Sequence, residues 1–382
     1  MQKVEAPGGQ VTALRCAALP TPSAVREALA QAVVRNVSIA MLSGFLTTGI
    51  AYGQETEPDR SVESATLRFE FDNDVFFGKD NQISSAWALQ KHSAVAQDWG
   101  ALEELPGFVR QLGRRIPTLT KRGLHCRAGI AIGQVIQTPD DLSRSDLIED
   151  DVPYAGALTI QATWYAYNHS EFRGFEITVG IVGPPSLAEQ TQTVVHALIG
   201  ADAPKGWGNQ LSTEPVINLN YMRKKRLWRK GEQSGFSFDG AINGNVGLGN
   251  LFTQATASLE LRMGHRMPGG FAYVPDPIGY SMHYNAALKV PAPRVMSLYG
   301  SLVLRGTAFA HNIFLDGNTF TESHSVDKEP FVGQIIVGLH FERPRWALRV
   351  YAFLSTDTVD TEKSPLAEGG ESLGIIAIEW RW

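Results

Sequence analysis

A glutamine and a histidine four residues apart carry the most useful chemistry in this chain. Gln192 and His196 fall within residues 186–199, the only strong helical pattern after the N-terminus. On a helix, residues i and i+4 lie on the same face, one turn apart. The ordinary pKa of histidine suits a general base near neutral pH, so the spacing predicts a helix that presents an imidazole beside an amide.

Both ends of this expected helix carry signals. Ser186 can serve as N-cap with Glu189 as its capping-box partner, and a pair of prolines blocks extension upstream. Gly200 can end the helix. A helix fixed in this way can hold His196 in place, although a histidine taken alone is more often a surface or structural residue.

Oxygen donors gather at the end of the first expected strand. The run Asp72–Asp80 contains Asn73 and Asp74, and a hydroxyl follows at Ser84. Carboxylate and amide oxygens are the ligands that Ca²⁺ prefers. A solvated hairpin turn is the alternative interpretation of this run, whose last residues suit a turn.

Strands must position these groups, and the last segment shows the pattern most clearly. Its alternate residues are Gly374, Ile376, Ile378, Trp380 and Trp382 on one face, and Ile375, Ala377, Glu379 and Arg381 on the other. A cationic side chain on the lipid face of a barrel costs about 2–4 kcal/mol near the bilayer midplane. The charged face is therefore expected to point inward, and the tryptophans suit an aromatic girdle at the membrane boundary.

Similar alternation predicts twelve strands and an all-β fold. The segments are 64–72, 83–92, 126–136, 155–168, 172–183, 214–228, 235–247, 253–265, 296–311, 330–342, 345–356 and 371–382. Residues 279–291 could form a thirteenth, but prolines crowd them and favour a loop. After residue 54 there is no apolar run of about 18 residues, so a membrane protein of this composition must be a closed antiparallel barrel. A soluble β-sandwich is the alternative.

The lengths of the connections suggest two unlike barrel ends. Short connections at 168–172, 248–252 and 343–346 suit the periplasmic side, and long ones at 93–125, 184–213 and 266–295 suit the outside. The helix that carries His196 would then lie in an extracellular loop.

The N-terminus resembles a secretory signal. Arg35 precedes an uncharged stretch at 37–50 and a small-x-small pattern at 51–53. We expect residues 1–53 to comprise a start placed too early plus a signal peptide, with translation beginning near Val34 or Met41, and residues 54–382 to form a single barrel domain. Removing the leader removes Cys16 and leaves Cys126 alone, so no internal disulfide is expected.

Other charged and polar groups have ordinary interpretations. The net charge of −5 gives no sign of a nucleic-acid partner. Asp146, Asp150 and Asp151 are expected to be loop charges, while Asn243 and Asn245 suit a hydrated lumen. A basic cluster at Arg223–Arg229 could meet lipid phosphates, but a solvated barrel rim is the safer interpretation.

Taken together, the motifs resemble the outer-membrane lipid A 3'-O-deacylases. Three blocks carry the resemblance in order: residues 71–74 leading to Ser84; residues 137–142 with 151–156; and residues 183–196 followed by 204–207 and 209–211. Ser84 stands where some members carry threonine, which keeps the hydroxyl. Ser85-Ala86 replaces the family's Asn-Gly, Val152 replaces an arginine, and no catalytic lysine aligns.

The resemblance implies a twelve-stranded, calcium-dependent enzyme of the bacterial outer membrane that removes the 3'-linked acyloxyacyl group of lipid A. The positions that match the family's active site are Asn73, Asp74, Ser84, Gln192 and His196. Lipid A or lipopolysaccharide and outer-membrane lipids would be the partners, and a monomer is expected.

A mechanism follows as a hypothesis. His196 would deprotonate a water that attacks the ester carbonyl, and Asp74 would hold Ca²⁺ against the carbonyl oxygen. Asn73, Ser84 and Gln192 would supply orienting hydrogen bonds. Two alternatives stay open: a phospholipase with a Ser-His nucleophilic pair, and a non-catalytic porin or adhesin barrel.

Overall fold

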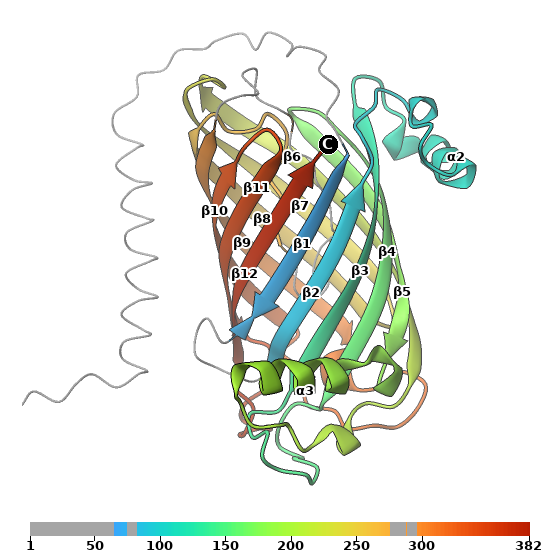
Figure 1. The fold of residues 1–382 in the computed structure, drawn as a ribbon, viewed down its shortest axis with the longest axis vertical. Coiled ribbons are helices and arrows are strands. Elements are labelled where there is room, and N and C mark those ends of the chain that lie inside the picture. Colours follow the sequence, from blue (N-terminus) through green and yellow to red (C-terminus); the bar gives the residue numbers. More distant parts are fainter. Residues whose placement is uncertain (1–64, 75–81, 276–287, 289–295) are drawn as a thin grey trace, which may run out of the picture. The chain divides into compact units, whose positions relative to one another are not determined.

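Twelve antiparallel strands close into a barrel in the computed structural model, which describes residues 65–74, 82–275, 288 and 296–382 (Figure 1). The expected leader and Cys16 lie outside the described residues, as does almost all of 279–291. The strands are β1 (Thr66–Asn73), β2 (Gln82–His92), β3 (His125–Thr138), β4 (Ala155–Tyr167), β5 (Glu171–Val182), β6 (Glu214–Gly231), β7 (Phe236–Gly249), β8 (Phe252–His265), β9 (Ser297–Asn312), β10 (Phe331–Glu342), β11 (Trp346–Asp357) and β12 (Gly370–Arg381). Each expected strand is present, and the predicted barrel is confirmed.

The barrel closes where the first strand pairs with the last. β1 and β12 are antiparallel neighbours in a register that runs from Thr66 opposite Arg381 to Asn73 opposite Gly374. Closure leaves no unpaired sheet edge, which is the condition for strands to lie in a lipid bilayer.

Period-two alternation decides which side chains face inward. On β12, Ala377 and Glu379 are buried while Trp380 is exposed, as the sequence predicted. β6 alternates in the same way and exposes Ile217 and Leu219 on its outer side. An exposed apolar band of this kind is what a lipid-facing wall requires.

Ion pairs fill much of the interior. Glu379 binds the guanidinium groups of Arg68 at 2.7 Å, Arg349 at 3.3 Å and Arg381 at 2.7 Å. Glu342 adds a second carboxylate, 3.1 Å from Arg349 and 2.9 Å from Arg381. Buried charges require this kind of pairing because burial removes their hydration.

The segment 266–275 folds into the barrel. Tyr273 is buried there, with the guanidinium of Arg68 3.7 Å from its ring centroid, and its carbonyl accepts a hydrogen bond from Tyr351. Arg226 donates to the carbonyls of Gly269 and Gly270 at 2.6 Å. Asn243 and Asn245 are buried in the same interior, where a hydrated lumen was expected.

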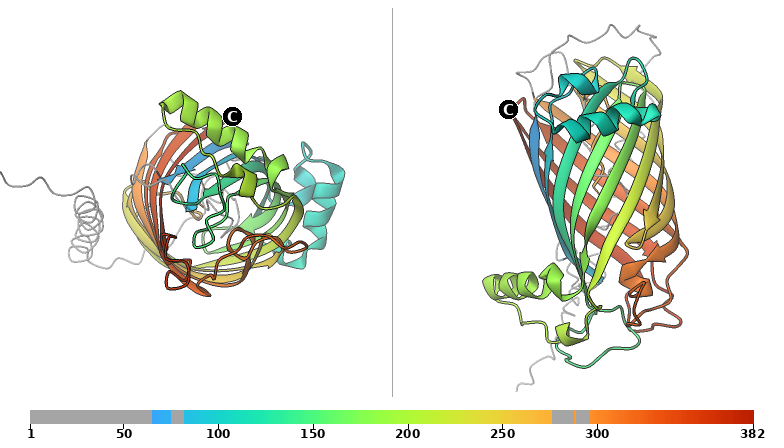
Figure 2. Two further views of the ribbon diagram at one scale, coloured as in Figure 1. Left: turned by 90° about the horizontal axis from the view of Figure 1, so that it is seen from below. Right: turned by 90° about the vertical axis from the view of Figure 1, so that its right-hand side faces the viewer.

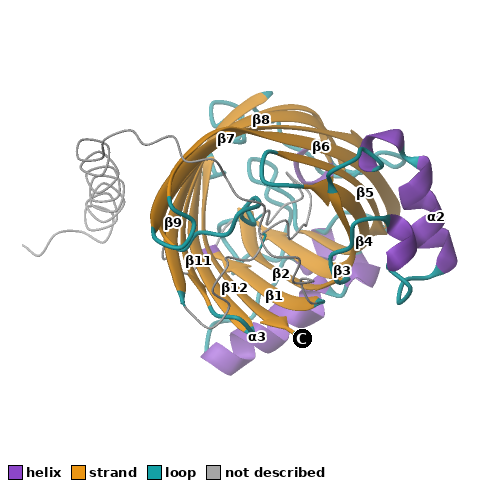
Figure 3. Cartoon of the chain, turned by 90° about the horizontal axis from the view of Figure 1, so that it is seen from above, coloured by secondary structure: helices purple, strands orange, loops and turns teal. Residues whose placement is uncertain are grey.

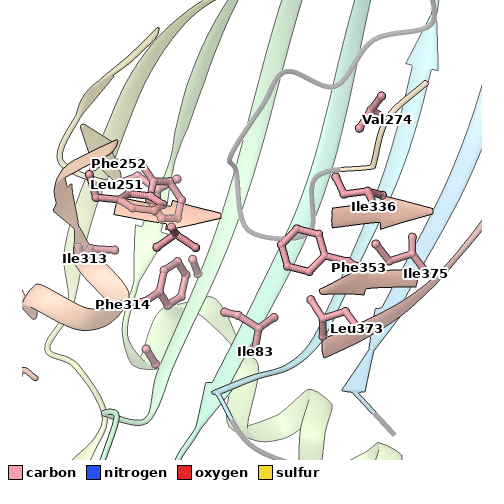
Figure 4. Close-up of a cluster of buried hydrophobic side chains, with 14 of the residues drawn as sticks. Ile83, Leu251, Phe252, Val274, Ile313, Phe314, Ile336, Phe353, Leu373 and Ile375 are labelled. Atoms are coloured by element: carbon pink, nitrogen blue, oxygen red, sulfur yellow. The ribbon is translucent and has the colours of Figure 1, made fainter. Parts of the chain in front are cut away.

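An apolar cluster crosses the interior toward the other end of the barrel. Phe252 from β8 stacks on Phe314, and Phe353 and Leu373 belong to the same cluster (Figure 4). Phe314 comes from the short helix α4 (Ile313–Asp316), which Asn312 caps by accepting a hydrogen bond from the Phe314 N–H. Gln137 on β3 binds the Phe314 carbonyl at 2.7 Å and so ties this connection to the wall.

We call the end where β1 begins and β12 ends the terminal end, and the opposite one the α3 end. Successive connections alternate between the two ends, so 183–213 lies at the α3 end, while 93–124 lies at the terminal end and the connection after β8 starts from that same end (Figure 1). The expectation that all three long connections share one side was wrong, and so was the placement of the tight 248–252 turn on the side of the other short turns. The length of a connection does not give its side; the strand order does, because each antiparallel strand reverses the chain.

Two longer helices of the described part of the chain flank the barrel: α2 (Gly107–Arg115) at the terminal end and α3 (Ala188–Ile199) at the other. No helix of the described residues is long and apolar enough to cross a membrane. The sequence predicted α3 but not α2. The predicted N-cap of α3 was also wrong: the prolines form a 3-10 turn through Ser186, and Leu187, with φ of 61°, stands at the cap without a side-chain bond. Gly200 ends α3 at φ of 74°, as predicted.

Candidate active site

Helix α3 runs along the outside of the wall, across the ends of β4, β3, β2 and β1 (Figures 1 and 2). Its N-terminal half contacts β3 and β4, and the helix continues toward the end of β1. The two chain segments that carry the expected site residues, the β1–β2 end and α3, are therefore neighbours in the fold although more than 100 positions separate them in the sequence.

The helix buries polar side chains toward the barrel and leaves aliphatic side chains exposed, together with the polar Glu189, Gln190 and Thr193. Among its described side chains, the buried ones are Ala188, Gln192 and His196, spaced four apart along one face. Val194 and Leu198 are exposed, Leu198 by 81%. A helix on a water-soluble protein normally shows the opposite arrangement.

A glycine on the wall permits the close contact. A Cβ atom at Gly156 on β4 would lie 2.2 Å from the Ala188 Cβ and 2.3 Å from the Ser186 hydroxyl oxygen. Gln134 on β3 adds a hydrogen bond of 2.7 Å to the Ser186 carbonyl. The start of α3 is therefore fixed by the wall rather than by a capping side chain.

Trp207 orients Gln192. Its indole N–H donates a 2.9 Å hydrogen bond to the side-chain carbonyl oxygen of Gln192. Trp207 is buried and packs on Tyr154, with ring centroids 5.0 Å apart. Because the amide oxygen is occupied, the NH₂ group of Gln192 is the end left to donate toward a substrate.

A backbone carbonyl sets the tautomer of His196. The Nδ1 atom lies 2.7 Å from the Asp202 carbonyl oxygen, which can only accept a hydrogen bond. Nδ1 therefore carries the proton and Nε2 the lone pair. This is the arrangement a general base needs.

A β-bulge supports the other half of the site. The register between β2 and β3 shifts between Ile83 and Ser85, which leaves Ser84 as the extra residue. The side-chain NH₂ of Asn73 donates a 2.8 Å hydrogen bond to the Ser84 carbonyl, so these two predicted residues are brought together. The Ser84 hydroxyl donates to the Ile136 carbonyl at 3.4 Å. Bulges commonly re-aim side chains beside active sites.

Asp74 is buried at the end of β1, 3% exposed, so it can offer a carboxylate that is shielded from water. Among the described residues, however, no group of three or more His, Cys, Asp or Glu side chains could hold a metal ion. Calcium takes six to eight oxygen ligands, including backbone and amide carbonyls and waters. The donor types at Asn73 and Asp74 fit calcium, but the described side chains alone do not complete a ligand set.

Asp151 is not the solvated loop charge that was expected. It is buried and accepts hydrogen bonds from the backbone N–H groups of Asp140, at 2.9 Å, and Val152, at 2.7 Å. Burial raises the pKa of its carboxyl to about 6. Its loop meets the α3 connection, where the Lys205 N–H donates to the Leu142 carbonyl. Asp151 therefore organises the support of the site.

Sequence reasoning missed Trp207 and Asp202 as supports of Gln192 and His196, although Trp207 stood in a block that resembled the family. A tryptophan directly after a glycine was a usable signal, because a Cβ at Gly206 would lie 2.3 Å from the Tyr154 ring. Asp202 acts through its backbone carbonyl, for which its side chain gives no signal.

Comparison with known families and structures gives one consistent answer. The family described as outer membrane protein LpxR matches residues 39–382. The solved structure of LpxR from Salmonella typhimurium is similar with a TM-score of 0.65 at 13% identity, covering 83% of this chain and all of that one. The translocator domain of the Neisseria meningitidis autotransporter NalP is less similar, with a TM-score of 0.36 at 7% identity over 93% of this chain and 98% of that one. No curated protein matches the sequence.

Proposed function

This chain belongs to the family of outer membrane protein LpxR, a family of lipid A-related outer-membrane proteins, and we propose that it hydrolyses the 3'-linked acyloxyacyl ester of lipid A. The family and the barrel give its location as the bacterial outer membrane. The specific reaction, the roles of the residues and the use of calcium are parts of the proposal.

One observation carries it: α3 buries a glutamine and a histidine against the barrel and exposes aliphatic side chains on its outer side. Gln192 and His196 occupy the buried row, while Val194 and Leu198 face outward. An apolar outer face suits acyl chains, and a polar inner face beside the wall suits an ester headgroup. A substrate whose ester lies at the membrane boundary meets both surfaces at once.

The residues divide the chemistry as follows. The Nε2 atom of His196 takes a proton from a water, whose oxygen attacks the ester carbonyl. The bond between the acyl carbon and the sugar oxygen then breaks, and the imidazolium returns the proton to the departing 3'-oxygen, which leaves a sugar hydroxyl and a free acyloxyacyl carboxylic acid. Gln192, oriented by Trp207, donates a hydrogen bond to the water or to the developing oxyanion. Asn73 holds the bulge that positions Ser84.

Calcium would be held at Asp74, with oxygen donors from its surroundings. When bound there, the ion would polarise the ester carbonyl as a Lewis acid. A chelator should then abolish hydrolysis, and added Ca²⁺ should restore it.

The test is mass spectrometry of lipid A incubated with the purified protein. Wild type should release a mass equal to an acyloxyacyl unit, and His196→Ala should release none while the barrel stays folded. His265→Ala is a matched control, because this histidine is exposed at the terminal end. An unchanged rate in H196A would refute the assignment of the base.

Ser84 separates water attack from a Ser-His nucleophilic pair. Its hydroxyl donates to the Ile136 carbonyl at 3.4 Å, an arrangement that favours support over attack. Ser84→Ala should therefore keep part of the activity, and an acyl-serine should not accumulate. Covalent labelling of Ser84 by a serine-reactive ester probe would favour the phospholipase alternative instead.

A further inference from the structure

The connection 97–124, which we call the α2 segment, lies outside the barrel wall at the terminal end. Figures 1 and 3 show α2 beside β4 and β5 rather than over the opening of the barrel. It packs on outward-facing side chains, with Trp164 of β4 and Phe175 and Ile177 of β5 in one cluster with Leu112 of the helix. On neighbouring parts of these strands, such as Ile160, the outward residues are exposed. The α2 segment therefore borders the lipid-facing band.

Specific bonds hold the segment to the wall. The Trp164 indole N–H donates to the Val109 carbonyl at 3.0 Å. Thr118 lies 3.1 Å from Tyr221 of β6, hydroxyl to hydroxyl. The segment is thus fixed at the level of Tyr221.

That level is where the outer wall changes from apolar to basic. Along β6 the exposed outward residues run from Ile217, Leu219 and Tyr221 to Arg223 and Lys225, and the exposed Leu227 follows at a shift in the register with β7. A tyrosine followed by cations is typical of the boundary between acyl chains and headgroups. The sequence had grouped these cations with Lys224, which instead points inward to Glu260.

The side of the α2 segment that does not pack on the wall adds an aromatic residue and further cations to this basic boundary. Phe108 is 71% exposed, and the basic residues Arg114, Arg115 and Arg122 are exposed too. Lys121 is committed to an ion pair with Glu171. The acidic residues Asp98, Glu103 and Glu104 all precede the helix, and α2 itself contains none. An aromatic residue with neighbouring cations is the composition of a segment that lies in a charged membrane surface.

The short connections at the terminal end indicate which leaflet of the membrane the α2 segment meets. Three of the four tight connections of the described residues, 168–170, 232–235 and 343–345, lie there and only 250–251 lies at the α3 end, and short turns mark the periplasmic side of outer-membrane barrels. The lipids at that side are phospholipids, so we propose that the α2 segment is a membrane-surface anchor that binds anionic phospholipid headgroups through Arg115 and Arg122, with Phe108 inserted among the acyl chains.

Native mass spectrometry of the purified full-length chain tests this, with dimyristoylphosphatidylglycerol and dimyristoylphosphatidylcholine titrated separately at low salt. Wild type should bind the anionic lipid more tightly. Arg115→Gln with Arg122→Gln should lower that association constant about thirtyfold, roughly fivefold for each charge. Equal constants for the two lipids in wild type would overturn the proposal.

Two control variants at the α3 end match the charge and aromatic substitutions in the α2 segment. Arg144→Gln with Lys363→Gln removes two exposed charges at the α3 end and should leave the constants unchanged; an equal loss there would count against the α2 segment. Phe108→Ser should weaken binding of both lipids by one common factor, because an apolar anchor does not read headgroup charge. Phe320→Ser, which is also 71% exposed but lies at the other end, should not.

Discussion

At the scale of single residues, the candidate site consists of groups held by neighbours that do no chemistry themselves. Asp202 fixes the proton on His196 Nδ1, Trp207 fixes the amide of Gln192, and Asn73 satisfies the carbonyl at the Ser84 bulge. Each support is a single hydrogen bond of 2.7–2.9 Å. Removing one such bond should change the rate more than the fold, which makes the supports good targets.

Trp207→Phe tests the support of Gln192. Phenylalanine keeps the packing on Tyr154 but removes the indole N–H, so the buried Gln192 oxygen loses its donor at a cost of about 1–3 kcal/mol. We expect kcat to fall roughly tenfold with KM nearly unchanged, measured on lipid A in detergent micelles. Trp228→Phe, at the far end of the barrel, is the control. A rise in KM alone would mean that Trp207 shapes the binding surface and does not position Gln192.

Asp151 predicts a pH dependence of the loop that supports α3. Its folded pKa, about 6, lies above the ordinary value of 3.8, so the folded state favours the protonated form. The contribution to stability is complete below about pH 4 and is lost as the pH rises through about 6. Hydrogen exchange at residues 139–154, corrected for intrinsic rates, should show more opening across that window in wild type. Asp151→Asn should lack the change, and the exposed Asp146→Asn should keep it.

At the scale of elements, the position of α3 depends on the absence of a side chain at Gly156 of the barrel wall. Gly156→Ala would place a methyl group 2.2 Å from the Ala188 Cβ and push the helix outward. We expect at least a tenfold loss of lipid A hydrolysis with an intact barrel. Ala188→Gly in the same chain should restore part of the activity, because it removes one of the two close contacts and leaves only the Ser186 hydroxyl oxygen, 2.3 Å from the added methyl group.

Gly306→Ala is the control for this pair, since a Cβ there meets nothing within 4 Å. Circular dichroism and the heat-dependent gel shift of folded barrels would confirm folding of each variant. A double variant no more active than Gly156→Ala would show that the contact with Ala188 does not cause the loss.

Strands were predictable because their burial has a simple period, and every expected strand formed. The N-cap of α3 and the presence of α2 were not predictable in this way. Pro184 and Pro185 form a 3-10 turn that includes Ser186. Ser186 is therefore not the N-cap of α3, and the predicted capping box is absent. α2 was missed because it is nine residues long and depends on packing against Trp99, earlier in the same connection, and Trp164, which lies on β4. A short helix of this kind is stabilised by tertiary packing that no local pattern reveals.

The candidate site was predictable only in part. The spacing of Gln192 and His196 predicted their shared buried face, because helix geometry is local. The bulge at Ser84 and the carbonyl at Asp202 depend on pairing and on loop paths, which residue types do not encode.

At the scale of the whole molecule, the two ends of the barrel meet different surroundings. The α3 end carries the candidate site, with its apolar helix face, and the terminal end carries the α2 segment, with its cations. The order of the strands decides which connection lies at which end, because each antiparallel strand reverses the direction of the chain. The filled interior, with Tyr273 and Phe314 buried in it, argues against the porin alternative, and planar-bilayer recordings of the wild type should show no steady conductance.

The interior charge network should set the stability of the whole barrel. Glu379 is fully buried and forms ion pairs with three arginines, one from β1, one from β11 and one from its own strand. Glu379→Gln leaves those guanidinium groups short of a counter-charge, and breaking such a buried network costs about 3–5 kcal/mol. We expect a clearly lower transition temperature in the heat-dependent gel shift. Lys363→Gln removes an exposed ion pair and should change little, because water screens that pair. A Glu379→Gln barrel as heat-resistant as wild type would mean that hydrogen bonds of the strands, and not the interior charges, keep the first and last strands together.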